Sequence, residues 1–539
     1  MPTRFADTLF QLVHSLEKSE KRAFKLYIKR NSAKEDLKII QLFDALDKLP
    51  EYDEKLLLKK LPGIEKHQLY NLKPHLYKQL LASLRLLKST ESIELQLTEQ
   101  LDYARILYNK GLYLQSLKIL DKIKEHALKY SQDTFLIHAI SLEKKIETLH
   151  ITRSMQDRAD RLTTEANEVH ERRAVITQLS NLALNLYSWY VKNGHARNEK
   201  DEAGVKAFFF SHLPPNAHEQ TGFYERLYLC QSYCWYAFIR QDFLMYYRYT
   251  QKWVNLFTEQ PHMIGVETGH YIKGMHNLLN AHFDLRNYQG FEHTLKQFED
   301  FAQSGIANQH DNFRVYTFVY VYIAKINQHF MHGTFKEGLQ LVPYIEEKLE
   351  EYALFLDRHR ILVFRYKIAT LYFGSGDFNT SIDYLQKIIN DNVDLRYDLQ
   401  CYARLVHLLA HYELGNFDII DYLIKSVYRF MAKMENLTVV EEEIFKFLRH
   451  SFAVPKNKLQ PELEKFLQKI KQLEKSRFET RSFAYLDIIS WVESKVYNKS
   501  MSQVINEKYR ASRNRNYNAN SKAKQSIVVK GKAPQNAEP

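Results

Sequence analysis

Two pairs of potential metal ligands in this sequence have their members four residues apart. His407 and His411 would lie on one face of a helix, at a spacing with which two imidazoles can hold one metal ion. No third ligand joins them, because Glu413 would point to another side of the same helix. Cys230 and Cys234 have the same spacing and stand among aromatic residues, which is typical of buried thiols. We therefore interpret both pairs as core residues and predict no metal site.

Motifs for catalysis and cofactor binding are scarce. Gly374-Ser375-Gly376 resembles the start of a dinucleotide-binding loop, but a helical pattern precedes it where that loop requires a strand. The sequence has no phosphate-binding loop of the Gly-x4-Gly-Lys-Ser/Thr form, no Gly-x-Ser-x-Gly motif and no His-Glu-x-x-His motif. We predict that the protein is not an enzyme and that it binds no cofactor.

The composition favours helices throughout the chain. Glycine and proline, which interrupt helices, account for only 16 and 12 of the 539 residues. Three cysteines are too few for a disulfide framework and suit a reducing compartment. The longest apolar run, residues 315–324, is far shorter than the roughly 18 residues that cross a bilayer, and residues 1–30 lack a signal-peptide pattern. We expect a cytoplasmic protein with no membrane partner.

One turn signature recurs along the chain: a small or polar residue, a second polar residue and an aromatic residue, between two amphipathic stretches. The copies are Gln241-Asp242-Phe243, Arg286-Asn287-Tyr288, Gly333-Thr334-Phe335, Gly376-Asp377-Phe378 and Gly415-Asn416-Phe417. They are spaced 39–47 residues apart, and Gly111-Leu112-Tyr113 is an earlier copy. Two degenerate units, with turns near Arg153 and Gly194, would fill the gap before Gln241. We predict helical hairpins, because glycine suits the left-handed residue after a helix and Asp or Asn caps the next one.

These hairpins resemble tetratricopeptide repeats. The residues that carry the resemblance are Ile368, Ala369, Tyr372, Gly376-Asp377-Phe378, Ser381, Ile382 and Ile388, and residues 101–130 match similarly. The units are longer than the 34 residues of the family, and Tyr246 and Phe291 occupy positions that the family fills with small residues. The period alone would also suit HEAT or armadillo units, but the turn signature favours the tetratricopeptide interpretation. Residues 315–326 have a strand-like composition, yet their place in the first helix of a repeat predicts helix.

The expected fold is all-α: an α-solenoid of tetratricopeptide-like hairpins with helical caps at both ends. Residues 1–90 would form an N-terminal helical domain or cap, and residues 91–435 the repeats. Residues 436–511 would form C-terminal capping helices, introduced by a Thr438-x-x-Glu441 capping box. Residues 512–539 are basic, rich in Asn and without core residues, so we expect a disordered tail.

The net charge of +12 raises the alternative of a nucleic-acid partner. Residues 1–100 carry +4, residues 501–539 carry +6, and the remaining 400 residues carry only +2. The N-terminal pattern of a short helix, a turn at residues 61–63 and a longer helix with basic residues is compatible with a helix-turn-helix or with a solenoid cap. The tail could be an electrostatic arm or a solvated end.

The resemblance implies that the first helix of each repeat lines a concave groove. Aligned on the turns, the groove positions are His276, Asn280, Phe283, Ile323, Asn327, Phe330, Tyr366, Thr370 and Phe373. Aromatic rings and asparagine amides there would bind the backbone of an extended peptide, although the phenylalanines could instead only pack between repeats. We predict a non-enzymatic scaffold that binds a protein or peptide partner in this groove. The alternative is a nucleic-acid-associated regulator that uses the N-terminal helices or the basic tail.

Overall fold

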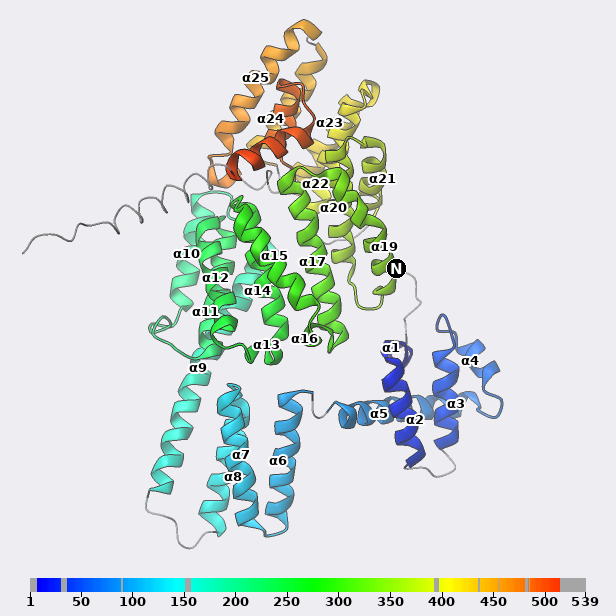
Figure 1. Ribbon diagram of the computed structural model, residues 1–539, viewed down its shortest axis with the longest axis vertical. Coiled ribbons are helices and arrows are strands. Elements are labelled where there is room, and N and C mark those ends of the chain that lie inside the picture. The colour runs from blue at the N-terminus through cyan, green and yellow to red at the C-terminus, as the bar shows by residue number, and fades with distance from the viewer. Residues whose placement is uncertain are drawn as a thin grey trace, which may run out of the picture. The chain divides into compact units, whose positions relative to one another are not determined.

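The computed structural model describes residues 7–30, 36–88, 91–150, 157–391, 397–434, 437–453, 455–479, 483 and 485–513. Within these ranges every regular element is a helix, so the predicted all-α class is confirmed (Figure 1). Residues 315–326, despite their strand-like composition, lie inside α17 (Asp311–His332). None of the helices in these ranges combines the length and apolarity that crossing a membrane requires.

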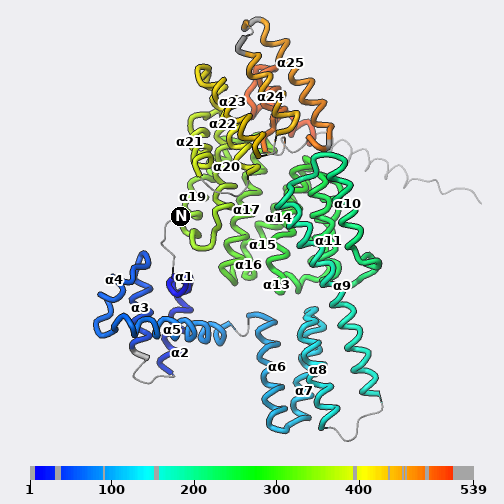
Figure 2. Tube along the Cα trace, turned by 180° about the vertical axis from the view of Figure 1, so that it is seen from behind, coloured from blue at the N-terminus to red at the C-terminus, as the bar shows by residue number. Residues whose placement is uncertain are grey.

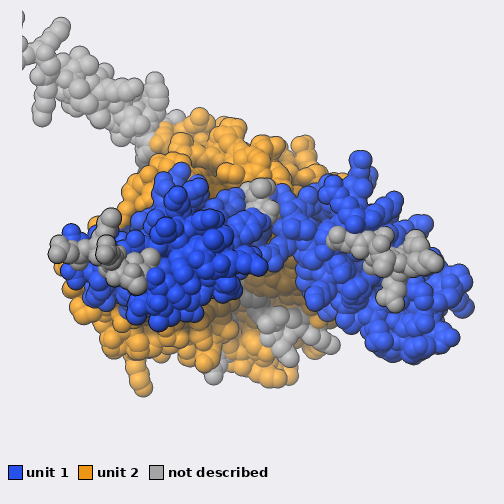
Figure 3. Space-filling view, turned by 90° about the horizontal axis from the view of Figure 1, so that it is seen from below, with its two compact units in different colours: residues 1–177, 222–224 blue, residues 178–221, 225–539 orange. Residues whose placement is uncertain are grey.

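The chain divides into two compact units, which Figure 3 distinguishes by colour. Unit 1 comprises residues 1–177 and 222–224, and unit 2 comprises residues 178–221 and 225–539. The division falls inside α9 (Arg158–Asn193), a helix of 36 residues, and so within the range that the turn pattern assigns to one array. Each unit buries apolar clusters of its own.

Unit 1 contains two apolar clusters, each built by consecutive amphipathic helices. The first is formed by α1 (Thr8–Ser15), α2 (Lys18–Arg30), α3 (Asp36–Asp47), α4 (Glu54–Lys60) and α5 (Lys66–Leu87). Leu9, Val13, Phe43 and Leu46 are buried in it, as their helical spacing predicts. The second cluster is formed by α6 (Ile93–Asn109), α7 (Tyr113–Lys129), α8 (Asp133–His150) and the first part of α9. Here α6 packs against α7, and α7 packs against α8.

Unit 2 is built mainly from consecutive pairs of helices. They are α10 (Glu199–His212), α11 (Phe223–Ile239), α12 (Phe243–Glu259), α13 (Met263–Val266), α14 (Thr268–Asp284), α15 (Tyr288–Ala302), α16 (Gly305–Asn308), α17, α18 (Phe335–Gly338), η2 (Leu339–Leu341), α19 (Val342–Glu351), α20 (Arg358–Ser375), α21 (Phe378–Ile389), α22 (Tyr397–Glu413) and α23 (Phe417–Lys433). α14 packs against α15, α20 against α21, and α22 against α23. In addition α14 contacts α17, α17 contacts α20, and α20 contacts α22, a succession that can be followed in Figure 2.

The turn signature ends a helix at every predicted copy in unit 2. Its first residue has a positive φ in each: 56° at Gln241, 51° at Arg286, 70° at Gly333, 92° at Gly376 and 73° at Gly415. Gly111 and Gly194 also have positive φ, whereas the turn expected near Arg153 lies outside the described residues. The side chains of Asp242, Asn287 and Asp377 cap the helices that follow by accepting a backbone N–H three residues later. The predicted turn chemistry is confirmed at these positions.

The C-terminal part of unit 2 contains α24 (Val439–Ala453), α25 (Lys456–Leu473), η3 (Arg477–Glu479) and α27 (Ile488–Val496), followed by helical residues 501–513. One half of the predicted capping box forms before α24: the Thr438 N–H donates to Glu441 Oε2 at 2.8 Å, and the Thr438 hydroxyl donates to the same carboxylate. The Glu441 carboxylate is buried and also accepts from the Tyr402 hydroxyl at 3.2 Å. The predicted tail lies outside the described residues from residue 514 onward.

Residues 195–202 are polar in composition, yet they do not form an exposed loop throughout. α10 already begins at Glu199, and Ala196 is fully buried with its N–H bonded to the Ile239 carbonyl at 2.9 Å. The His195 ring also reaches backbone, with Nδ1 2.8 Å from the Phe238 carbonyl oxygen. These partners lie at the end of α11, some forty residues later, so no local pattern announces them.

Candidate functional site

The two pairs of possible metal ligands lie within helices. The His407 and His411 ring centroids are 4.6 Å apart, and burial lowers the pKa of His407 to about 4. His411 Nδ1 is 2.9 Å from the amide of Asn416 in the following turn. Cys230 and Cys234 are buried thiols without a disulfide, and burial raises the pKa of Cys230 to about 12. The described residues contain no group of three or more His, Cys, Asp or Glu side chains arranged to hold a metal ion.

The glycines at 374 and 376 have a structural explanation in helix packing. Gly374 lies in α20, and a Cβ at this position would come within 2.3 Å of the Phe335 ring. Gly376 is the left-handed residue that ends α20. A helix, α20, precedes Gly376 where a dinucleotide-binding loop would require a strand.

The nine residues predicted to line a groove lie on α14, α17 and α20 and fall into two groups. The half-buried ones are His276, Asn280, Phe283 and Phe330, and the buried ones are Ile323, Asn327, Tyr366, Thr370 and Phe373. Asn280 Nδ2 lies 3.1 Å from His276 Nε2, and Asn327 Oδ1 accepts a hydrogen bond from Lys367 at 2.6 Å. Both asparagine amides therefore already have a partner within the chain.

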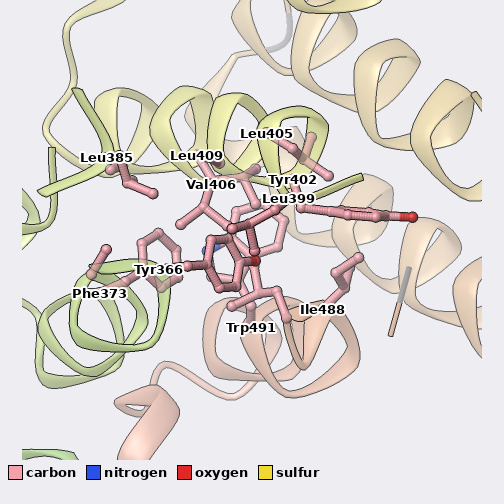
Figure 4. Packing of buried hydrophobic residues seen from close by; sticks show 14 of the residues in the cluster. Tyr366, Phe373, Leu385, Leu399, Tyr402, Leu405, Val406, Leu409, Ile488 and Trp491 are labelled. Atoms are coloured by element: carbon pink, nitrogen blue, oxygen red, sulfur yellow. The ribbon is translucent and has the colours of Figure 1, made fainter. Parts of the chain in front are cut away.

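Part of this face is covered by the chain's own residues 485–496. The Tyr366 hydroxyl donates to the Tyr485 carbonyl at 3.1 Å, and the Tyr485 ring stacks on Tyr402 of α22 with centroids 3.9 Å apart. Figure 4 shows Ile488 and Trp491 of α27 lying beside Tyr366 and the apolar residues of α22. The Trp491 indole N–H donates to Glu413 at 2.7 Å. Because Ile488 and Trp491 are buried, α27 is an integral part of the core of unit 2.

Helical residues 501–513 continue this cover along the turns that follow α14 and α17. The Ser502 hydroxyl donates to the Gly333 carbonyl, and Asn506 Nδ2 donates to the His332 carbonyl at 2.9 Å. The Tyr509 ring stacks on His332 with centroids 4.1 Å apart. These contacts join residues more than 160 positions apart in the sequence. On the same three helices Lys273, Tyr316, Tyr320 and Arg360 are half-buried, and we call the stretch that carries them the accessible stretch.

A cavity of about 160 Å³ lies where the C-terminal residues meet α14, α17 and α20. Four of the predicted groove residues line it: Phe283, Phe330, Tyr366 and Thr370. Arg286 and Asp487 also line it and form an ion pair at 3.6 Å. Lys367 lines it as well, so the cavity is mainly apolar with three charged residues in its lining.

The same face of α14, α17 and α20 carries a group of six residues, of which the sequence analysis predicted only Phe330. In each of three pairs a cation from α14 or α20 lies over an aromatic ring of α17. The pairs, with distances from the charged group to the ring centroid, are Arg360 over Tyr316 at 4.4 Å, Lys273 over Tyr320 at 5.4 Å and Lys367 over Phe330 at 5.4 Å. We call these six residues the cation–ring cluster. All six are half-buried.

Three of the other residues could have been found from the sequence. Lys273, Tyr320 and Lys367 each stand three residues before a position selected by the turn alignment, and so lie on the same helical face one turn earlier. On α20 the alignment selects Tyr366, which is buried, whereas the neighbouring Lys367 is half-buried. A one-residue offset turns a side chain by about 100° around a helix, so alignment on the turn alone does not identify the accessible face of α20.

The surroundings of the cluster shift the pKa values of several groups. Burial, together with the nearby Arg360, lowers the pKa of Lys273 to about 8. His276 stacks on Tyr320 at 4.0 Å, and burial with the neighbouring cations lowers its pKa well below the ordinary value. Burial raises the pKa of Asp284 to about 7, against the opposing effect of Arg286 and Lys367. At neutral pH the histidine is uncharged and the aspartate is only partly ionised.

The basic residues of the helix-turn-helix hypothesis are mostly paired within unit 1. The pairs are Lys66 with Glu54 at 3.1 Å, Lys73 with Asp7, Arg85 with Asp102 at 3.5 Å and Lys88 with Glu20 at 3.0 Å. Lys73 also lies 4.7 Å from the Tyr52 ring centroid. These carboxylates would compete with phosphates for the same cations, which weakens the electrostatic case for DNA at this helix.

No family model, curated protein or solved structure matches this chain.

Proposed function

We propose that this chain is a non-enzymatic interaction protein that binds a protein or peptide partner at the accessible face of α14, α17 and α20. In this proposal the helix pairs are repeats similar to tetratricopeptide repeats, arranged as an α-solenoid between helical ends. Left-handed residues at every turn signature and direct contacts between the first helices of successive pairs support this interpretation.

One observation carries the proposal: three successive helices present half-buried rings and cations on one face. Fully buried side chains would indicate a core, and fully exposed ones a solvated surface. Half-buried aromatic rings beside polar groups are what a binding face requires, because they offer large and rigid contact area. The covered part of the same face already has its partner in residues 485–509.

Affinity capture with paired variants tests this function. Full-length protein and a variant with Asn280→Ala and Phe330→Ala are used to capture proteins from native lysate. A control variant carries Leu244→Ala and Tyr422→Ala, which change exposed residues on α12 and α23. We expect a captured protein that the control retains and the first variant loses. It should also bind the purified wild-type chain directly. Equal binding by both variants would contradict a role for this face.

The alternative of a nucleic-acid-associated regulator has weaker support from the residues around α5. Four of its basic residues are paired with carboxylates, and the basic residues beyond position 513 lie outside the described ranges. Retention on heparin would separate the two ideas. Salt-sensitive binding that survives removal of residues 514–539 and is lost with Lys78→Glu and Arg85→Glu, two basic residues of α5, would favour the nucleic-acid alternative.

A further inference from the structure

The cation–ring cluster carries positive charge that the protein itself leaves only partly neutralised. Arg360 has an ion pair with Asp357, and Lys367 donates to the amide of Asn327 and also interacts electrostatically with Asp284. Lys273 has no ion pair with any carboxylate among the described residues, although it is half-buried. A half-buried ammonium without a counter-ion has lost hydration that no partner charge replaces, which disfavours its charged form.

Other lysines of unit 2 have carboxylate partners. Lys495 pairs with the buried carboxylate of Glu413, and Lys471 and Lys508 both pair with buried Glu493, each at 2.6 Å. In unit 2, therefore, the lysines that hold helices together are paired with carboxylates. Lys273 is an exception to this pattern, and Lys273, Arg360 and Lys367 all lie close enough to His276 to lower its pKa.

The nature of the rings favours a peptide over a nucleic acid at this place. A nucleobase needs an open aromatic face to stack on. His276 already stacks on Tyr320 at 4.0 Å, and the Arg360 guanidinium lies 4.4 Å from the Tyr316 centroid. In addition, residues 101–500 carry a net charge of only +2, which gives a phosphate backbone little net attraction to this part of the chain.

We propose that the cation–ring cluster binds the carboxylate side chains of an acidic segment of the partner protein, laid across α14, α17 and α20. This inference rests on the proposed function and specifies the chemistry of its partner. Carboxylates would provide the counter-charge that Lys273 lacks and would share Arg360 with Asp357. Methylene groups of the same acidic side chains would lie against the half-buried edges of Tyr316 and Tyr320.

Fluorescence anisotropy with defined probes tests the inference on the full-length chain. The probes are three fluorescein-labelled twelve-residue peptides, of alternating Glu-Ala, Gln-Ala and Lys-Ala, and a labelled oligouridine of the same length. We expect the Glu-Ala peptide to bind more tightly than the other three and to weaken as salt is raised. The double variant Lys273→Met and Arg360→Met should lose at least about tenfold in affinity, because it removes two charge-assisted contacts.

A matched control comes from the opposite helix of a pair. Lys387 on α21 lies 4.5 Å from the Tyr384 centroid, so Lys387→Met removes a charge and a cation–ring contact outside the proposed face. This variant should retain wild-type affinity for the Glu-Ala peptide. Equal losses in both variants would show non-specific attraction and overturn the inference. Tighter binding of oligouridine than of the Glu-Ala peptide would overturn it in favour of a nucleic acid.

The outcomes separate this inference from the function on which it rests. If a partner captured from lysate depends on Asn280 and Phe330 but not on Lys273 and Arg360, the binding face stands and the acidic partner is wrong. Loss of the Glu-Ala peptide in the Lys273→Met and Arg360→Met variant, with its thermal unfolding unchanged or raised, would support the inference. Failure of all four probes and of every captured partner would contradict both proposals.

Discussion

Replacement of Gly333 by alanine should detach helical residues 501–513 from the rest of unit 2. Gly333 has a φ of 70°, and its α-carbon faces the C-terminal helix. A Cβ there would lie 2.5 Å from the Ser502 carbonyl oxygen and 2.9 Å from the Asn506 nitrogen, both of which are backbone atoms. Because backbone cannot move aside as a flexible side chain does, the helix must shift as a whole.

Gly376→Ala separates this collision from the cost of the turn itself. Gly376 has a similar φ of 92°, but nothing lies within 4 Å of the position that its Cβ would take. Gly376→Ala should therefore destabilise by about 1–2 kcal/mol, the usual cost of a left-handed alanine. Gly333→Ala should carry the same cost. It should also lose the hydrogen bonds that Ser502 and Asn506 donate to the carbonyls of Gly333 and His332, at about 1 kcal/mol each. We expect a total of about 3–4 kcal/mol.

Hydrogen exchange followed by mass spectrometry measures the local stability of residues 501–513 in each variant. A global unfolding curve would not resolve it, because the chain has two units. Amides of residues 501–513 should exchange much faster in Gly333→Ala than in wild type or in Gly376→Ala. Peptides from α20 and α21 should instead respond to Gly376→Ala. Unchanged protection of residues 501–513 in Gly333→Ala would refute the close packing on which the argument depends.

Three further predictions follow from single groups. Lys273→Met should stabilise the protein by about 1 kcal/mol at pH 7, after allowing for the partial exposure of the side chain. The stability of the wild type should rise between about pH 8 and pH 10.5, because in this range Lys273 is protonated in the unfolded chain but not in the folded one. Calorimetry should show that the variant lacks this rise. Glu413→Gln should loosen α27, because the carboxylate that accepts from Trp491 and pairs with Lys495 loses its charge. We expect a red shift of tryptophan fluorescence and a lower Tm. An unchanged Tm would contradict this prediction. Cys230 should react with maleimide only after unfolding, because burial raises its thiol pKa to about 12; rapid labelling of the native protein at pH 7 would contradict this.

The features that could be predicted from the sequence are those that short segments determine. The left-handed turn residues follow from the turn signature. The prediction is correct even at Gln241 and Arg286, where the residue is not glycine. The Thr438–Glu441 capping box needs only four consecutive residues. Helix in residues 315–326 follows from the period of the turns, which outweighs local composition.

The contacts that define the candidate site depend instead on residues far apart in the chain. Tyr485 reaches back 119 positions to Tyr366, and Asn506 reaches back 174 positions to His332. Nothing in the spacing of residues 485–513 distinguishes a helix that caps an array from one that lies across its inner face. The cation–ring cluster likewise combines α14, α17 and α20, so it becomes visible only when the order in which these helices pack is known.

The two parts of the face of α14, α17 and α20 differ in how their polar groups are satisfied, and this difference bears on where a partner binds. In the covered part, Tyr366 donates to the Tyr485 carbonyl and Arg286 faces the carboxylate of Asp487, so the chain supplies both members of each contact. In the accessible part, Lys273 has a ring beside it but no carboxylate among the described residues. Stability alone would favour methionine over lysine at such a position, because a half-buried charge without a counter-ion is unfavourable. A lysine there is explained if its counter-ion comes from another molecule, and that makes the accessible part of the face the place to look for the partner.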